Sequence, residues 1–168
     1  MKFSLSARPR VCQDAFAMGD NFGLKGELVS DYVPHLKLTH EGALKMLRAG
    51  IAKAQEMKQP QCITITDDGG HLLAFVRMDG AKVLSIDSSR KKALTAASGR
   101  APSGEANVAN EVKLAFATEG KLTNLKGGLP VVVEGHVIGA IGVGSGTGEQ
   151  DLEVAKAMLA ALPGAKQF

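Results

Sequence analysis

Hydrophobic positions change their spacing several times along the chain, and each change predicts a new element. From Thr39 apolar residues recur at helical spacing, so we expect a helix that ends before Pro60. Its predicted core stripe consists of Leu44, Leu47, Ile51 and Ala54. Residues 61–67 then alternate strictly between two faces and are rich in β-branched side chains, which is typical of a strand.

A tight turn follows this strand and predicts a β-hairpin. The turn sequence is Asp67-Asp68-Gly69-Gly70, and residues 71–78 continue as the second strand. Residues 85–98 return to helical spacing, and Gly99 is well suited to ending that helix. The residues of this helix expected to face the core are Ile86, Leu94 and Ala97.

The second half of the chain repeats the arrangement. Residues 105–116 keep a helical period through Val108, Val112 and Ala115, which favours a further short helix. Residues 130–134 and 136–144 form a second predicted hairpin. A final helix follows, with a core stripe of Leu152, Ala155, Leu159 and Leu162. Because hairpins require antiparallel pairing, the pattern predicts an α+β fold with helices packed on an antiparallel sheet.

The first 38 residues differ from the rest of the chain. They combine Arg8-Pro9-Arg10 with scattered glycines and short apolar pieces. We therefore expect an N-terminal extension or arm over residues 1–38 and a single domain over residues 39–168.

Composition narrows the classes of function. The 168 residues include 20 glycines, nine of which lie between Gly120 and Gly148, and this excess indicates close backbone approach there. Aromatic residues make up only 4% and the net charge is +3 without a basic tract, which argues against a nucleic-acid partner. No apolar run is long enough for a membrane helix. The two cysteines, Cys12 and Cys62, predict no disulfide framework, and we expect a cytoplasmic protein.

Four stretches of the chain are similar to one known family. They are Asp-Asp-Gly-Gly-His-Leu-Leu-Ala-Phe-Val-Arg-Met-Asp-Gly-Ala at 67–81, Ser-Ser-Arg-Lys-Lys-Ala-Leu-Thr-Ala at 88–96, Gly-Gly-Leu-Pro-Val at 127–131 and Gly-Ala-Ile-Gly-Val-Gly-Ser-Gly-Thr-Gly-Glu-Gln-Asp at 139–151. Together they resemble the GlcG/HbpS family, which also occurs as the C-terminal domain of PduO-type proteins. The resemblance implies a profilin-like antiparallel sheet of about five strands, flanked by helices, in dimers or larger rings. It also implies haem binding in some members and an isomerase-like role in others.

Histidines and arginines are the first candidates for ligand binding. His71 begins a strand just after the Gly-Gly turn, where its imidazole could ligate haem iron or act as an acid or base. A hydrogen bond from this imidazole to the backbone is the alternative interpretation. His136 has an equivalent place in the second hairpin, and His35 would reach a pocket if the arm folded back. Arg77 and Arg90 could pair with the carboxylates of haem or of an organic acid.

Lys92 and the glycine-rich loop are the second set of candidates. Lys92 and Thr95 lie on one side of a helix, where the lysine could act as a base or an electrostatic clamp. Packing of its stem with the ammonium in solvent is the alternative. The loop over residues 142–148 leads into a helix, so its backbone N–H groups could bind an anion. Glu149 and Asp151 at that helix start favour instead a dipole that is already satisfied.

Three hypotheses follow for the function. The leading one is a small-ligand-binding homo-oligomer for haem or a similar planar anionic molecule, with His71 as iron ligand. Its expected ligand-binding residues are Arg77, Arg90, Lys92, Thr95, Gly142 and Ser145. The second is a cofactor-independent isomerase or tautomerase acting on a small unsaturated carboxylic acid in a catabolic pathway. Its expected catalytic residues are Lys92, His71 and Asp151. The third is a non-catalytic accessory subunit.

Overall fold

Antiparallel strand pairing organises residues 35–168, the part of the chain that this computed structural model describes. The strands are β1 (Cys62–Asp67), β2 (Leu72–Arg77), β3 (Gly128–Val133) and β4 (His136–Gly144). The helices are α1 (His40–Glu56), α2 (Ser85–Gly99), α3 (Val108–Ala117) and α4 (Gly148–Ala160). The sheet order is β2-β1-β4-β3, with every neighbouring pair antiparallel. The predicted α+β fold is confirmed.

The number of strands is a correction to the sequence-based expectation. The described residues form four strands rather than about five. At the outer edge of β3 the C-terminal segment adds only an isolated bridge between Val133 and Ala165. The N–H of Lys166 donates a further hydrogen bond of 2.8 Å to the Val132 carbonyl. The arm predicted for residues 1–38 lies almost wholly outside the described residues. No helix in the described region is long and apolar enough to cross a membrane.

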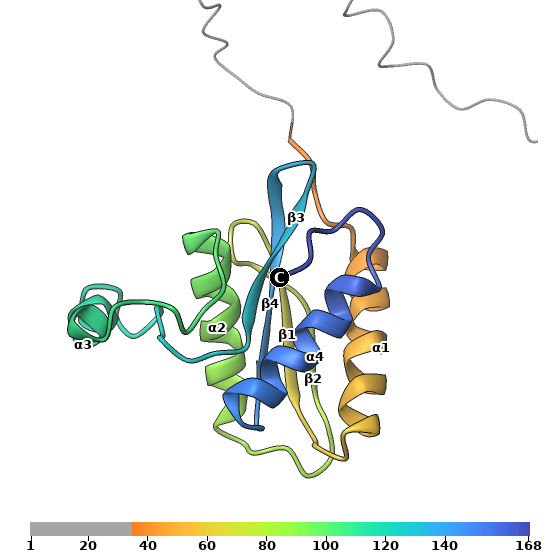
Figure 1. Cartoon of the computed structure of the whole chain (residues 1–168), viewed down its shortest axis with the longest axis horizontal. Helices are drawn as coiled ribbons and strands as arrows, with labels where there is room; N and C mark the ends of the chain where they lie inside the picture. The colour runs from red at the N-terminus through yellow and green to blue at the C-terminus, as the bar shows by residue number, and fades with distance from the viewer. Residues whose placement is uncertain (1–34) are drawn as a thin grey trace, which may run out of the picture. The chain divides into compact units, whose positions relative to one another are not determined.

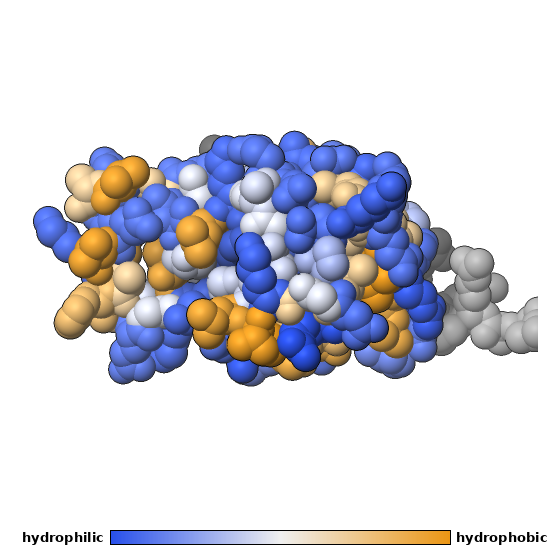
Figure 2. Space-filling model, turned by 90° about the horizontal axis from the view of Figure 1, so that it is seen from below, coloured by the Kyte–Doolittle hydropathy of each residue, from blue (hydrophilic) through white to orange (hydrophobic). Residues whose placement is uncertain are grey.

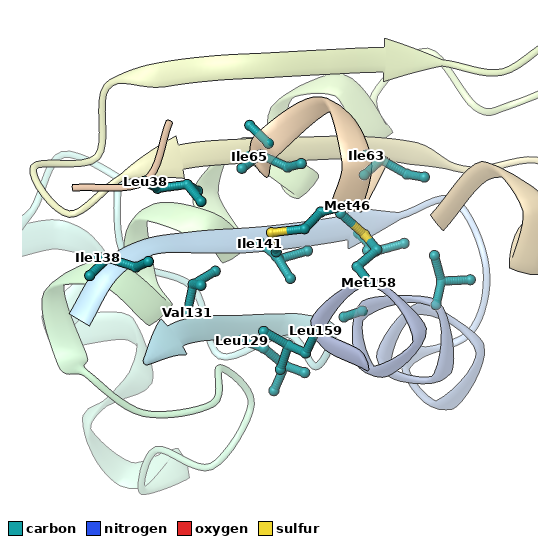
Figure 3. Packing of buried hydrophobic residues seen from close by; sticks show 14 of the residues in the cluster. Leu38, Met46, Ile63, Ile65, Leu129, Val131, Ile138, Ile141, Met158 and Leu159 are labelled. Carbon is teal, nitrogen blue, oxygen red and sulfur yellow. The ribbon is translucent and has the colours of Figure 1, made fainter. Parts of the chain in front are cut away.

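Helices cover both faces of the sheet. Figure 1 shows α1 and α4 on one side and α2 on the other. Residues that face α1 and α4 build the main hydrophobic core, and Figure 3 shows Met46 and Met158 converging on Ile63 and Ile141. The register pairs Ile65 with Ile141 and Ile141 with Leu129, so this row of the core crosses three strands.

The buried stripe of α1 includes Ala54 as predicted, but its other positions lie one residue before the predicted Leu44, Leu47 and Ile51. Its fully buried residues are Ala43, Met46, Gly50 and Ala54, whereas Leu47 and Ile51 are only partly buried. The reason is close contact with α4: a Cβ placed on Gly50 would lie 2.8 Å from the Met158 side chain. Small residues of α1 lie directly against α4, and the larger hydrophobic residues of α1 lie beside this contact. In α4, Ala155 and Leu159 are buried as predicted, and Val154 and Met158 join them.

Helix α2 turns a polar and small-residue face to the sheet. The expected core residue Ile86 is 37% exposed, and the expectation was wrong. Of the other expected residues, Ala97 is buried and Leu94 is partly buried. The remaining buried residues of α2 are Ser85, Ser89, Lys92, Ala93 and Ala96. The cause lies in β4, where a Cβ on Gly142 would overlap the Ser89 carbonyl oxygen. The hydroxyls of Ser89 and Thr64 are hydrogen-bonded at 2.9 Å, which satisfies both inside this tight contact.

Helix α3 forms where the period predicted it, but it does not face the core. Val108, Val112 and Phe116 are 75%, 74% and 87% exposed, and no residue of α3 is buried. Figure 1 shows α3 standing away from the sheet beyond α2. The predicted helix is therefore present, but its apolar side is exposed, because periodicity marks an apolar side of a helix without identifying its packing partner.

The tight contact between α2 and β4 predicts that Gly142→Ala is strongly destabilising. The added methyl meets backbone that cannot move aside, so we expect a loss of about 2–3 kcal/mol in the free energy of unfolding. Gly99→Ala is the matched control, because a Cβ at Gly99 meets nothing within 4 Å. Chemical denaturation of both variants measures the difference. Equal stability of the two would contradict the backbone contact.

Candidate functional site

Lys92 and Asp151, two of the three residues expected to be catalytic, are in contact with each other in the interior. The Lys92 side chain is 5% exposed and that of Asp151 is 3% exposed. The Lys92 ammonium lies 2.6 Å from Asp151 Oδ2 and donates a second hydrogen bond of 2.7 Å to the Val143 carbonyl. One ammonium thus connects α2, β4 and α4.

The remaining surface of this ion pair is enclosed by backbone. Asp151 Oδ1 accepts a hydrogen bond of 2.9 Å from the Gly146 N–H. A Cβ on Gly127 would lie 2.6 Å from the Asp151 side chain and 3.2 Å from the Lys92 ammonium, so only glycine fits there. Both charges are matched, and the geometry describes a structural clamp.

The glycine-rich loop before α4 forms hydrogen bonds with other residues of the same chain. The Gly146 N–H also lies 3.1 Å from Gln61 Oε1, and Thr147 and Gln150 form a reciprocal capping box. Ser145 Oγ accepts a hydrogen bond of 2.9 Å from the Lys82 N–H. The N–H groups of Gly146 and Thr147, two of the backbone donors expected to bind an anion, are therefore occupied, and Ser145 and Gly142 are buried packing residues.

Glu149 lies at the start of α4 and is also paired. Its carboxylate is 2.6 Å from the Lys126 ammonium. The hydrogen bond from Lys126 lowers the pKa of Glu149 below its usual value. Because the partner carboxylate favours the charged form of the amine, the pKa of Lys126 is raised. The positive end of the α4 dipole is thus faced by two carboxylates, as one of the sequence interpretations anticipated.

His71 lies at the opposite end of β4 from Lys92. Its side chain is 83% exposed, and Nδ1 lies 3.2 Å from both carboxylate oxygens of Asp67. Asp67 pairs with Gly139, whereas Lys92 binds near Val143. His71, Lys92 and Asp151, the three residues of the isomerase hypothesis, therefore do not share one site.

The pKa of the Asp67 carboxyl group is affected by this histidine. Desolvation acts to raise its pKa, but hydrogen bonds from the His71 backbone and imidazole outweigh that effect, so the pKa of Asp67 is lowered. The His71 N–H donates to Asp67 Oδ1 at 2.8 Å. Both groups act here in closing the β1–β2 turn.

The other expected ligand-binding residues lie on or near α2 and β2. Arg77 and Arg90 are exposed. Thr95 Oγ1 donates to the Lys91 carbonyl at 2.8 Å and accepts from the Thr123 N–H at 3.0 Å, so it ties the segment after α3 to α2. These three side chains do not converge with the Lys92–Asp151 pair.

A basic cavity lies at the end of the sheet that is opposite the Lys92–Asp151 pair. Its volume is about 630 Å³, and it is bounded by the β1–β2 turn, the β3–β4 turn, the end of α2 and the C-terminal segment. Its charged and titratable residues are His35, Asp68, Arg100, His136 and Lys166. Ala97, Val132, Val137 and Phe168 contribute apolar wall. Neither His71 nor Lys92 lines this cavity.

Local contacts hold the cavity residues in place. His35 Nε2 lies 3.5 Å from Asp68 Oδ2, an arrangement that orients the imidazole. Arg100 directly follows α2 in a left-handed conformation, with φ of 53°. The Lys166 ammonium lies 4.7 Å from the centre of the Phe168 ring. The cavity thus combines two imidazoles with two cations, which suits an anionic ligand.

Sequence reasoning found only part of this cavity. His35 and His136 were weighed as secondary candidates, whereas Arg100 and Lys166 carried no signal. These four residues come from segments that are far apart in the chain and meet only through strand pairing. The histidine that follows each glycine turn was the usable signal, and it pointed to His71 more strongly than to His136. Among residues 35–168 no three histidine, cysteine or acidic side chains gather as a metal cluster.

Comparison with known proteins places these features in a family context. Residues 38–160 match the family described as "Haem degrading protein HbpS-like". Protein GlcG of Escherichia coli strain K12 is 44% identical over 107 residues, which cover 63% of this chain and 80% of GlcG. An uncharacterized 15.0 kDa protein of Citrobacter freundii is 40% identical over 129 residues, which cover 73% of this chain and 89% of that protein.

Solved structures show the same fold. The Klebsiella pneumoniae protein ORFY has a TM-score of 0.75 and 31% identity, covering 80% of this chain and 97% of its own. A PduOC–haem complex has a TM-score of 0.72 and 26% identity, covering 79% and 99%. A double mutant of Streptomyces reticuli HbpS has a TM-score of 0.71 and 29% identity, covering 86% and 97%.

The enclosed ion pair predicts a large cost for removing one partner. Lys92→Met leaves Asp151 buried without its cation, and we expect a loss of about 3–5 kcal/mol in the free energy of unfolding. The double variant Lys92→Met/Asp151→Leu removes both charges and is expected to recover much of that loss. A denaturation-based double-mutant cycle measures the coupling. Additive effects of the two changes would contradict the clamp.

Proposed function

This chain belongs to the HbpS-like family, and on that premise we propose that it binds haem or a similar planar anionic molecule. The observation that carries the proposal is the basic cavity, with His35 and His136 beside Arg100 and Lys166. Its volume of about 630 Å³ is within the ~300–1,000 Å³ range typical of small-molecule sites. A structural relative crystallised as a PduOC–haem complex supports the same choice of ligand class.

The residues present fit haem in chemical type. A neutral imidazole of His35 or His136 is a suitable axial ligand for iron. Arg100 offers two parallel N–H donors to one carboxylate and Lys166 a point charge to another. Val132 and Val137 are the apolar wall for the flat face of the ring. Bound haem would supply a redox-active iron, while these side chains bind, orient and charge-match it.

An open cavity also distinguishes ligand binding from a purely accessory role. An accessory subunit without a ligand would be favoured by a closed, fully packed interior. Here a basic hollow is built where five chain segments meet, the segment before α1 included, and two imidazoles face it from separate segments. This arrangement supports the ligand-binding hypothesis over the accessory one.

We also propose that the chain self-associates, in the cytoplasm, as a homo-oligomer. The apolar side of α3 supports this, because Val108, Val112 and Phe116 are exposed with no partner among the described residues. Apolar side chains gathered on one exposed helix mark interaction surfaces in soluble proteins.

Titration of the apo-protein with haem tests the ligand. We expect a shifted Soret band with one equivalent of haem per chain, and a weaker or spectrally altered complex in His35→Ala or His136→Ala. His71→Ala is the control, because His71 lies outside the cavity. Absence of a Soret shift in the wild type would overturn haem as ligand. A shift that is lost only in His71→Ala would move the site to the β1–β2 turn.

The cationic wall of the cavity gives a second prediction. Arg100→Gln removes a charge-assisted hydrogen bond worth about 1.5–3 kcal/mol, so we expect haem affinity to fall about 10- to 100-fold. Arg48→Gln, on an exposed position of α1, is the matched control. Equal dissociation constants for the two variants would show that Arg100 does not bind the ligand.

A further inference from the structure

Helix α3 lacks a packing partner within the described chain. A helix of 10 residues is marginal in water on its own, because nucleation is costly and few hydrogen bonds repay it. Its apolar side is fully hydrated, and Figure 2 shows these hydrophobic side chains gathered at the end of the molecule where Figure 1 places α3. The helix is therefore expected to gain stability when another surface covers Val112 and Phe116.

The edge strand β2 is uncovered on one side. Helix α2 packs over β1, β4 and β3. Leu72 and Phe75 pair with Thr66 and Thr64, so their side chains point to the α2 side of the sheet. They remain 51% and 36% exposed. The sheet thus has an apolar strip beside α2 that no described element fills.

One side of α2 forms the wall of this strip. A Cβ on Gly70, in the β1–β2 turn, would clash with Leu94, so the Leu94 side of α2 faces β2. Arg90 and Ile86 lie one and two turns, respectively, before Leu94 on that same side. We call the resulting surface the open face; its residues are Leu72, Phe75, Arg77, Ile86 and Arg90.

We propose that α3 of one copy docks on the open face of a second copy. This inference rests on the proposed self-association and names its surfaces. Glu111 and Glu119 border the hollow formed by Val112, Ala115 and Phe116 on α3. The open face has Arg77 and Arg90 beside its apolar residues. The two surfaces are therefore both apolar at the centre and carry opposite charges beside it.

The two surfaces are different, which restricts the symmetry of assembly. A contact between unlike surfaces closes either as a dimer that exchanges α3 reciprocally or as a ring of head-to-tail contacts. In both arrangements every copy donates one α3 and accepts one. A variant damaged on α3 can therefore still accept the α3 of another copy on its open face. A variant damaged on the open face can still donate its own α3.

Complementation between two variants tests this directly. Phe116→Asp damages only the donor surface and Phe75→Asp only the acceptor surface. Each alone is expected to be a monomer of 17.5 kDa by size-exclusion chromatography with light scattering. An equimolar mixture is expected to form heterodimers of twice that mass, since one intact contact remains. Native mass spectrometry identifies one copy of each variant in that species.

Controls keep the result interpretable. Leu72→Asp repeats the acceptor test at a more exposed position, in case Phe75→Asp unfolds, and circular dichroism checks folding. Leu36→Asp is the matched control, because Leu36 is exposed to a similar degree outside both surfaces. Dissociation by Phe116→Asp but not by Phe75→Asp or Leu72→Asp would overturn the open face as acceptor. An unchanged mass in all variants would overturn the whole inference.

The measurements that would contradict the proposed function differ from those that would contradict the docking. A wild-type chain that is monomeric at micromolar concentrations would overturn self-association itself, and this docking with it. The haem titration is read from absorbance of the wild type and does not depend on either variant. A haem-binding oligomer that ignores these substitutions would therefore remove only the docking inference.

Discussion

Helix α2 lies so close to the sheet that its backbone directly contacts β4 and β3. Gly142 and Gly128 face the carbonyls of Ser89 and Lys92, and a Cβ on either glycine would overlap them. With no room for large side chains, the inner side of α2 is made of serines and alanines. The long side chain of Lys92 runs along this contact to Asp151, and its charge needs that partner because water is excluded. The glycines at 128, 142 and 144 and the buried ion pair are consequences of one close approach.

Local periodicity predicted all eight elements, yet it misjudged which side of several helices is buried. In α1 the most hydrophobic side and the buried side differ by one position, because the contact with Met158 selects the small Gly50 over its larger neighbours. In α2 the prediction of Ile86 as core failed because β4 offers glycines rather than a hydrophobic surface. Spacing reports the preferences of one segment, whereas burial is decided by the segment that packs against it.

The environment of the candidate catalytic residues was likewise decided by the segments that pack against them. Lys92 and Asp151 were singled out for their residue types, and the structure does bring them into contact, but 59 positions apart in sequence and sealed by Gly127 and Gly146. Residue type alone does not separate a buried clamp from an acid–base pair, since both need matched opposite charges. The basic cavity was harder to foresee, because its cations stand just after a helix end and near the C-terminus, outside any recognisable spacing.

The stretches that resemble the GlcG/HbpS family and the residues that line the basic cavity are almost separate sets. The four stretches cover residues 67–81, 88–96, 127–131 and 139–151, and they contain the glycines, Ser89, Lys92 and Asp151 of the α2–sheet contact. His35, Arg100, His136 and Lys166 all fall outside them. Packing residues tolerate little change, because a single Cβ at Gly142 meets backbone. Cavity residues at chain turns are free of that constraint. Relatives can therefore keep the same sheet and clamp while the ligand differs, and sharing the four stretches is an argument about fold and not about what is bound.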